Sequence, residues 1–164
     1  MIVPDVNVLV YAHRADMTEH EPYRAWLDWL VNSGPAYGMS EMVLSSFVRV
    51  VTNRRIYLKP TENHEALASA ARLLAPPQCV PVRPGPGHWE IFEDLCRRHP
   101  PRSKLVADAY LAAIVMEAGC DLATADRDFA RFEGLRWHHP LAGKPGGEGG
   151  VVMEPRRRPW LESD

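Results

Sequence analysis

The stretch Ile2–Tyr11 (IVPDVNVLVY) opens the chain with apolar residues around a single acid, Asp5. A short β-branched run of this kind is typical of a buried strand, and the polar residue just past it marks the carboxyl end of that strand. We therefore expect Asp5 near a strand terminus. Ligands of parallel sheets bind outside the carboxyl ends of the strands, so Asp5 is the first candidate for a functional residue.

Strands and helices alternate along the rest of the chain, which predicts a parallel sheet with helices on both faces. Further strands are expected at residues 36–40, 79–82, 121–124 and 134–137, and helices at 18–32, 40–52, 61–75, 88–99 and 105–118. Helical spacing predicts that the third of these helices buries Leu67, Ala70, Ala71 and Leu74, and that the fourth turns Trp89, Phe92 and Leu95 inward.

Length and composition predict one domain, because 164 residues with 46% hydrophobic and 24% charged side chains match an ordinary globular chain. We assign residues 1–140 to this domain. Residues 141–164 are rich in Gly, Pro and Arg, and we interpret them as a flexible tail or an expression remnant. No apolar run is long enough to cross a membrane and no signal peptide is recognisable, which predicts a cytoplasmic protein without a membrane partner.

Three acids are expected at the same edge of the sheet: Asp5, Asp108 within an apolar helix, and Asp126 just after the strand at 121–124. Taken singly, each has an ordinary structural explanation as a turn residue, a helix cap or a partner of the helix dipole. Taken together, their carboxylates would repel one another unless a cation held them. Mg²⁺, or Mn²⁺ in its place, prefers such oxygen ligands and activates water at a phosphodiester.

Four stretches resemble one family in the same order along the chain. Residues 1–12 resemble the opening of PIN-domain ribonucleases of the VapC toxin type, 43–53 resemble a helix of one VapC subgroup, and 108–113 and 122–129 resemble its two closing motifs. The resemblance runs from residue 1 to about residue 140. It implies a PIN-like, three-layer α/β/α fold, Mg²⁺-dependent endoribonuclease activity, a toxin role with a cognate antitoxin, and a homodimer.

The resemblance also assigns roles to individual residues. Asp5 and Asp108 match the principal metal-binding acids, Asp126 matches a later acid, Asn7 matches a polar residue that braces Asp5, and Thr124 matches a hydroxyl near the acids.

One position departs from the family pattern, because Ser46 stands where the family commonly has a glutamate. The nearest acid, Glu41, lies five residues earlier, which is about 7.5 Å along a helix, so it can serve only from a different geometry. We expect Glu41 to complete the catalytic set, directly or through water. Asp128 is a reserve candidate in the loop of Asp126.

A nuclease with a net charge of −2 needs local cations to attract a polyanion. Candidates for RNA phosphate contacts are Arg49, Arg54, Arg55, Arg102 and Lys104.

Two other functions stay open. A degenerate PIN-like domain would bind RNA or a protein partner without cleavage, and Ser46 keeps this reading open. A Mg²⁺-dependent phosphatase of the haloacid dehalogenase type also begins with a strand and an Asp, but it needs a second Asp where this chain has Asn7.

Overall fold

The computed structural model describes residues 1–32, 35–100 and 104–142. All but the first two residues of the expected tail at 141–164 lie outside the described residues, so the tail stays a prediction. Arg102 also lies outside them, and of Lys104 only the backbone is described.

The described chain forms a five-stranded sheet with the order β3-β2-β1-β4-β5, in which every pairing is parallel. β1 is the central strand, and its residue Pro4 pairs with Ala123 of β4. The last strand begins at Trp137, where we had expected it to end, because Leu122 and Ala123 of β4 pair with residues 137 and 138. The strands are β1 (Ile2–Pro4), β2 (Tyr37–Met39), β3 (Cys79–Pro81), β4 (Asp121–Ala123) and β5 (Trp137–His138).

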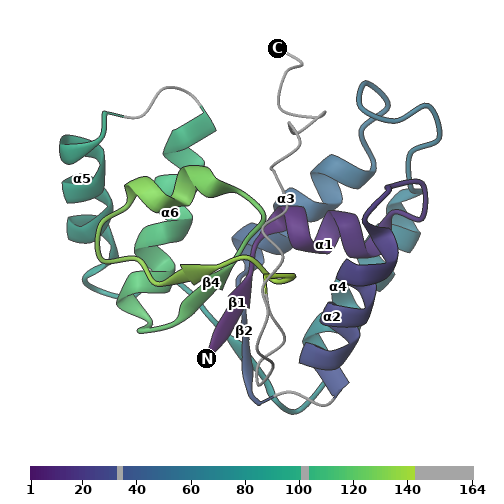
Figure 1. The fold of residues 1–164 in the computed structure, drawn as a ribbon, viewed down its shortest axis with the longest axis horizontal. Coiled ribbons are helices and arrows are strands. Elements are labelled where there is room, and N and C mark those ends of the chain that lie inside the picture. Colours follow the sequence, from purple (N-terminus) through teal and green to yellow (C-terminus); the bar gives the residue numbers. More distant parts are fainter. Residues whose placement is uncertain (33–34, 101–103, 143–164) are drawn as a thin grey trace.

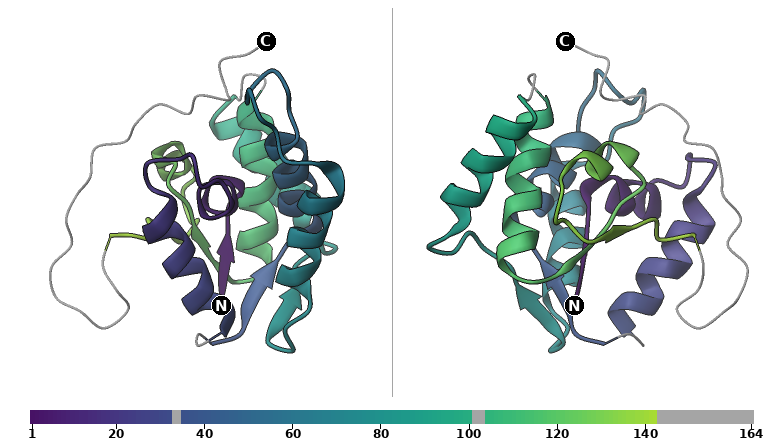
Figure 2. Two further views of the ribbon diagram at one scale, coloured as in Figure 1. Left: turned by 90° about the vertical axis from the view of Figure 1, so that its right-hand side faces the viewer. Right: turned by 60° about the vertical axis from the view of Figure 1, so that its left-hand side comes forward.

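Helices cover both faces of this sheet, which confirms the three-layer α/β/α prediction (Figures 1 and 2). One layer holds α1 (Val6–His13), α2 (His20–Asn32), α3 (Glu41–Val51) and α4 (Asn63–Leu74); the opposite layer holds α5 (His88–Arg98) and α6 (Lys104–Glu117). A short 3₁₀ helix, η1 (Arg127–Arg131), follows β4. The connections from β1 to β2 and from β2 to β3 move toward one edge of the sheet, whereas the connection from β3 to β4 moves back past β1. Because each crossover is right-handed, the helices of the last connection lie on the opposite face.

The opening apolar run is only partly a strand, since β1 ends at Pro4 and the residues from Val6 form α1. Asp5 causes the change by capping the helix: its carboxylate accepts a hydrogen bond from the Val6 amide at 2.7 Å. Residues 7–12 are all buried, so the helix is apolar on every side and its sequence shows no helical periodicity.

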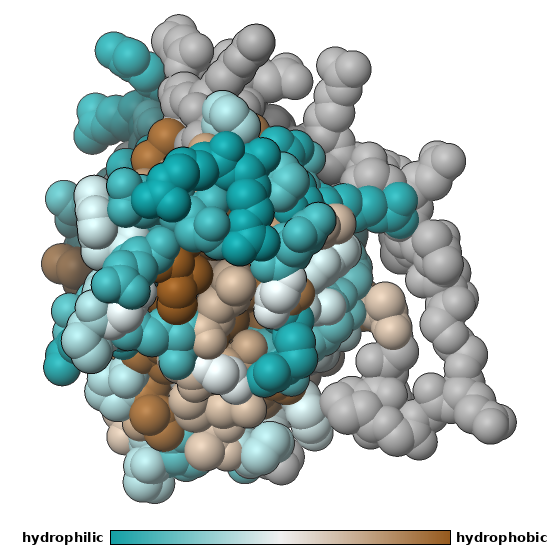
Figure 3. All heavy atoms as spheres, turned by 90° about the vertical axis from the view of Figure 1, so that its left-hand side faces the viewer, coloured by the Kyte–Doolittle hydropathy of each residue, from teal (hydrophilic) through white to brown (hydrophobic). Residues whose placement is uncertain are grey.

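Two predicted helix faces were wrong in detail. α4 buries Ala70 as expected, together with Ala66, while Leu67 is 58% exposed and Ala71 and Leu74 are exposed as well, because the small alanines 66 and 70 form the face that packs against the domain. On α5, Leu95 is buried as expected, but Trp89 is 63% exposed. Figure 3 shows the side of the molecule on which α5 lies, and apolar residues interrupt the hydrophilic surface there.

No helix among the described residues is long and apolar enough to span a membrane.

Candidate active site

Asp5 lies at the junction of β1 and α1, where its side chain is almost completely buried. One carboxylate oxygen accepts the Val6 amide, and the other accepts two side-chain donors, Asn7 Nδ2 at 2.6 Å and Thr124 Oγ1 at 2.7 Å. Burying a carboxylate is costly unless donors or a cation compensate, and these three hydrogen bonds supply part of the compensation. The result is a carboxylate with a fixed orientation at the carboxyl edge of the sheet.

Asn7 in α1 and Thr124 just after β4 together hold this carboxylate. Thr124 directly follows β4 and is fully buried; besides donating to Asp5, its hydroxyl accepts Asn7 Nδ2 at 3.0 Å and the Asp126 amide at 3.0 Å. Asn7 Oδ1 in turn accepts the Ala125 amide at 3.1 Å. The pairing of β1 with β4 brings these groups together although about 120 positions separate them in sequence.

Asp126 follows Thr124 into the same region and caps η1, since its carboxylate accepts the Asp128 amide at 2.9 Å. The backbone bond from Asp126 to the Thr124 hydroxyl places it next to the Asp5 network. The Asp128 side chain is exposed and forms an ion pair with Arg131 at 3.2 Å. The structure thus joins Asp5, Asn7, Thr124 and Asp126 and gives the Asp128 carboxylate a separate partner.

Asp108 reaches the same edge of the sheet through a different element. β4 begins at the amino edge, so α6, which leads into it, must begin near the carboxyl edge. Asp108 lies in the second turn of α6 and is half-buried, directly before the buried residues 109 and 111–115. An acid at this position on an otherwise apolar helix is consistent with the predicted role.

Glu41 is the first residue of α3, just beyond the carboxyl end of β2. Its side chain is exposed and forms an ion pair with Arg83 at 2.5 Å. Our sequence reasoning missed Arg83, although its position two residues beyond β3 was a signal, because that end of the strand lies at the same edge. Ser46 lies half-buried in the middle of α3.

Three of the predicted RNA-binding cations have described side chains, and they lie at the end of α3 and in the loop between α3 and α4. Arg49 is exposed in the last turn of α3, and Arg54 and Arg55 are exposed in the loop that follows.

The oxygen donors at the site fit Mg²⁺ in kind and number. Within residues 1–32, 35–100 and 104–142, no three His, Cys, Asp or Glu side chains converge on one metal position. Mg²⁺ in proteins usually binds one or two carboxylates and keeps several waters, so it does not need such a group. A buried, oriented carboxylate at Asp5 with an acid on α6 therefore fits Mg²⁺, or Mn²⁺, as a ligand set.

A cavity of about 620 Å³ lies elsewhere, among α1, α2, α3 and α4. None of the proposed site acids lines it. The chemistry suggested by the acids is therefore separate from this cavity.

Comparison with known proteins agrees with the fold. Residues 2–135 match the PIN domain family. The chain is 46% identical to ribonuclease VapC43 of Mycobacterium tuberculosis, over 88% of this chain and 98% of that protein. The chain belongs to the VapC family of PIN-domain proteins. This VapC-family chain is also 38% identical to ribonuclease VapC25 of the same organism, over 85% of its length and 99% of the relative.

Solved structures share the fold of this VapC-family chain. VapC20 of Mycobacterium tuberculosis, described as a toxin that cleaves the sarcin-ricin loop, has a TM-score of 0.61 and 20% identity over 83% of this chain and 99% of that one. FitAcB of Neisseria gonorrhoeae has a TM-score of 0.61 and 23% identity, over 85% and 98%. The family match favours the nuclease interpretation over the phosphatase.

Proposed function

We propose that this VapC-family chain is a Mg²⁺-dependent endoribonuclease that acts as the toxin of a toxin-antitoxin pair. The observation that carries the proposal is the buried network in which Asn7 and Thr124 orient the Asp5 carboxylate beyond the carboxyl ends of the paired strands β1 and β4. The names of the relatives, which are ribonucleases, support the same activity.

In this proposal Asp5 and Asp108 hold the ion, and Mn²⁺ can replace Mg²⁺. When bound, the ion supplies an acidified water and neutralises charge at the phosphate. Asn7 and Thr124 keep Asp5 from turning away, while Asp126 and Glu41 complete the ligand set or accept the proton of the attacking water. Asp128 supports Asp126 by donating its backbone amide.

The proposed partners are RNA, an antitoxin and a second copy of the chain. Arg49, Arg54, Arg55, Arg102 and Lys104 are the proposed phosphate contacts. The fold is shared with chains of VapBC2 from Rickettsia felis and of FitAB, both solved bound to DNA. Both are toxin-antitoxin complexes, which supports an antitoxin partner for this chain. The homodimer, the cytoplasmic location and the domain boundary at residue 140 stay predictions.

Cleavage of a structured RNA tests the proposal. The wild-type protein, Asp5→Asn and the control Asp28→Asn are incubated with the RNA in Mg²⁺ and in EDTA. We expect cleavage by wild type and control in Mg²⁺ only, and a loss of at least about a hundredfold in Asp5→Asn, because a ligand has been removed. Asp28 is a suitable control because it is exposed on α2.

Equal cleavage under all conditions would contradict the mechanism. RNA binding without cleavage would favour the degenerate, binding-only domain, for which the serine at position 46 is the specific observation.

A further inference from the structure

The loop between α3 and α4 carries exposed cations that have no acidic partner. Arg54, Arg55 and Lys59 lie in this loop, and Arg49 lies in the last turn of α3. Within the described part of the chain none of the four forms an ion pair, whereas seven other arginines do. Most arginines in the described part of this acidic protein are therefore paired locally, and those around this loop are available to an external anion.

The loop between α3 and α4 lies on the same side of the sheet as the Asp5 network. In Figures 1 and 2 it extends past the helices on the side toward which β1 points, and the Asp5 network lies at that end of β1. Cations that flank a carboxylate site attract a polyanion to it, since net charge does not provide the attraction here.

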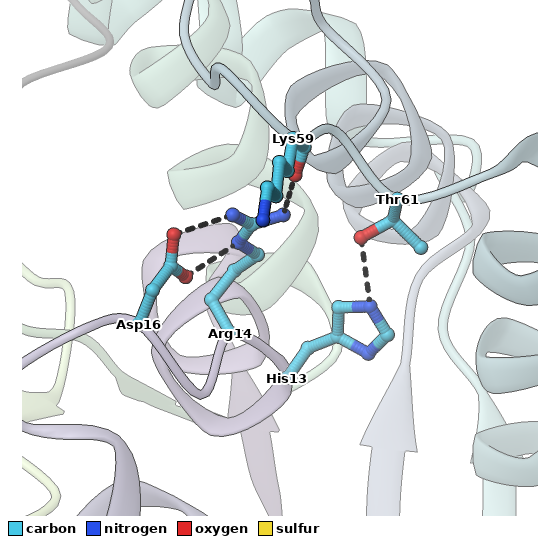
Figure 4. Close-up of polar contacts among 5 residues, drawn as sticks. All are labelled: His13, Arg14, Asp16, Lys59 and Thr61. Carbon is cyan, nitrogen blue, oxygen red and sulfur yellow. Dashed lines mark hydrogen bonds and ion pairs between the residues drawn. The ribbon is translucent and has the colours of Figure 1, made fainter.

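A buried arginine ties this loop to α1. Arg14 directly follows α1 and is 9% exposed. Its guanidinium donates two hydrogen bonds to Asp16, at 2.8 and 2.5 Å, and a third to the Lys59 carbonyl at 2.9 Å (Figure 4). The guanidinium carbon also lies over the Tyr57 ring, 4.0 Å from its centre. The planar guanidinium can make these contacts together, whereas a lysine ammonium cannot.

A second contact holds the loop two residues further along, at Thr61. His13, the last residue of α1, lies 3.2 Å from the Thr61 hydroxyl, and the Thr61 amide donates to the Val51 carbonyl at 2.8 Å (Figure 4). The same helix that begins at Asp5 thus fixes the loop at both Lys59 and Thr61. A loop ordered in advance loses less conformational entropy when it binds a ligand.

We propose that residues 53–60 form an RNA-binding arm and that Arg14 is the positioning residue that holds this arm relative to the acids. The proposal rests on the proposed nuclease function and adds to it the surface that binds the substrate. Arg54, Arg55 and Lys59 contact phosphates, and Arg14 acts through Tyr57 and the Lys59 backbone without touching RNA.

The arm is tested by binding, separately from cleavage. Fluorescence anisotropy of a fluorescein-labelled RNA stem-loop is measured in the Asp5→Asn background with EDTA, over a range of salt concentrations. Arg54→Ala/Arg55→Ala is compared with Arg24→Ala/Arg136→Ala, which removes the same charge from α2 and from the loop before β5.

We expect the arm variant to bind roughly tenfold more weakly and to lower the slope of log Kd against log salt by about 1.4 if the two lost phosphate contacts lie in the single-stranded loop, or by about 1.8 if they lie in the stem. The control should change neither quantity by as much. Equal affinity and equal slope in the two double variants would overturn the proposal that this arm binds RNA. Failure of the wild-type protein to cleave would count against the nuclease and leave this comparison valid.

Arg14→Lys tests the positioning role, because it keeps the charge and loses the planar contacts. In the cleavage-competent protein we expect KM to rise roughly fivefold with kcat unchanged. If Arg14→Lys does not fold, Tyr57→Leu removes the stacked ring and leaves the Arg14–Asp16 pair; Tyr57→Phe keeps the ring as its control. A folded variant with wild-type KM, or with a fall in kcat alone, would overturn the role of Arg14.

Discussion

At the scale of single residues, the site depends on one fully buried hydroxyl. Thr124 donates to Asp5 and accepts from Asn7 and from the Asp126 amide. The same oxygen therefore connects two proposed catalytic acids. Its removal would leave the buried Asn7 amide and the part-buried Asp126 amide without this acceptor, which is more costly than losing an exposed hydrogen bond.

Thr124→Val keeps the shape of this side chain and removes the hydroxyl. We expect the free energy of unfolding to fall by about 1–3 kcal/mol and cleavage to fall roughly ten- to a hundredfold, because Asp5 loses a donor that orients it. Chemical denaturation and initial cleavage rates measure the two effects. Thr18→Val, at an exposed position, is the control. A stable but fully active Thr124→Val protein would show that the hydroxyl does not orient the acid.

His13 makes a pH dependence predictable at the same scale. Burial, followed by the nearby charges of Arg14 and Arg72, lowers the pKa of His13 below its usual 6.5. The unfolded chain therefore takes up a proton at higher pH than the folded protein does. The contribution of His13 to the free energy of unfolding is fully present above about pH 6.5, and it is lost as the pH falls toward the lowered pKa of the folded protein. Burial also lowers the pKa of His138 and His139, so the three histidines act in the same direction.

We expect the melting temperature to fall between about pH 7.5 and about pH 5.5, and His13→Gln to reduce this fall. Differential scanning calorimetry across that range measures it. His64→Gln, on the exposed side of α4, is the control. An unchanged pH profile in His13→Gln would contradict the contribution of His13.

At the scale of elements, the connection from β2 to α3 decides how the missing family glutamate is replaced. Residue 46 lies more than a helical turn from the carboxyl edge, whereas Glu41 begins α3 at that edge. Its ion pair with Arg83 is exposed, so the pair adds less than about 1 kcal/mol to stability. Any large effect of Glu41 on cleavage would therefore be functional.

Glu41→Gln should lower cleavage roughly tenfold and leave the free energy of unfolding nearly unchanged. Arg83→Gln is the matched variant, since it breaks the same pair and keeps the carboxylate. We expect a smaller loss of cleavage from it, measured on the same RNA. Wild-type cleavage by Glu41→Gln would remove Glu41 from the catalytic set.

At the scale of the whole molecule, the sheet order converts distant sequence positions into neighbours. β1 lies between β2 and β4, so the residues that follow these three strands meet at one edge. Asp5, Ser40 and Thr124 are those residues, and all three are buried. This arrangement places the Asp5 carboxylate beside the Thr124 hydroxyl that orients it.

The sequence by itself determined the fold class, most element positions and the placement of Asp5 and Asp126 just after strands. These follow from local patterns, since the alternation of strands and helices and acids just after strands are visible in short windows. The association of Asn7 and Thr124 with these acids came from the resemblance to the VapC family. The sequence did not determine the start of α1 or the buried faces of α4 and α5. An all-apolar run has no periodicity to distinguish strand from helix, and a helix face depends on the surface it packs against.

Only the tertiary structure decided which partners each charge has. It joined the Asp5 and Thr124 side chains across two strands, paired Glu41 with Arg83, and used Arg14 to hold the loop that carries Arg54. Hydrogen bonds and ion pairs act over a few ångströms in space, and contacts between residues 40 to 120 positions apart exist only once the sheet order is fixed.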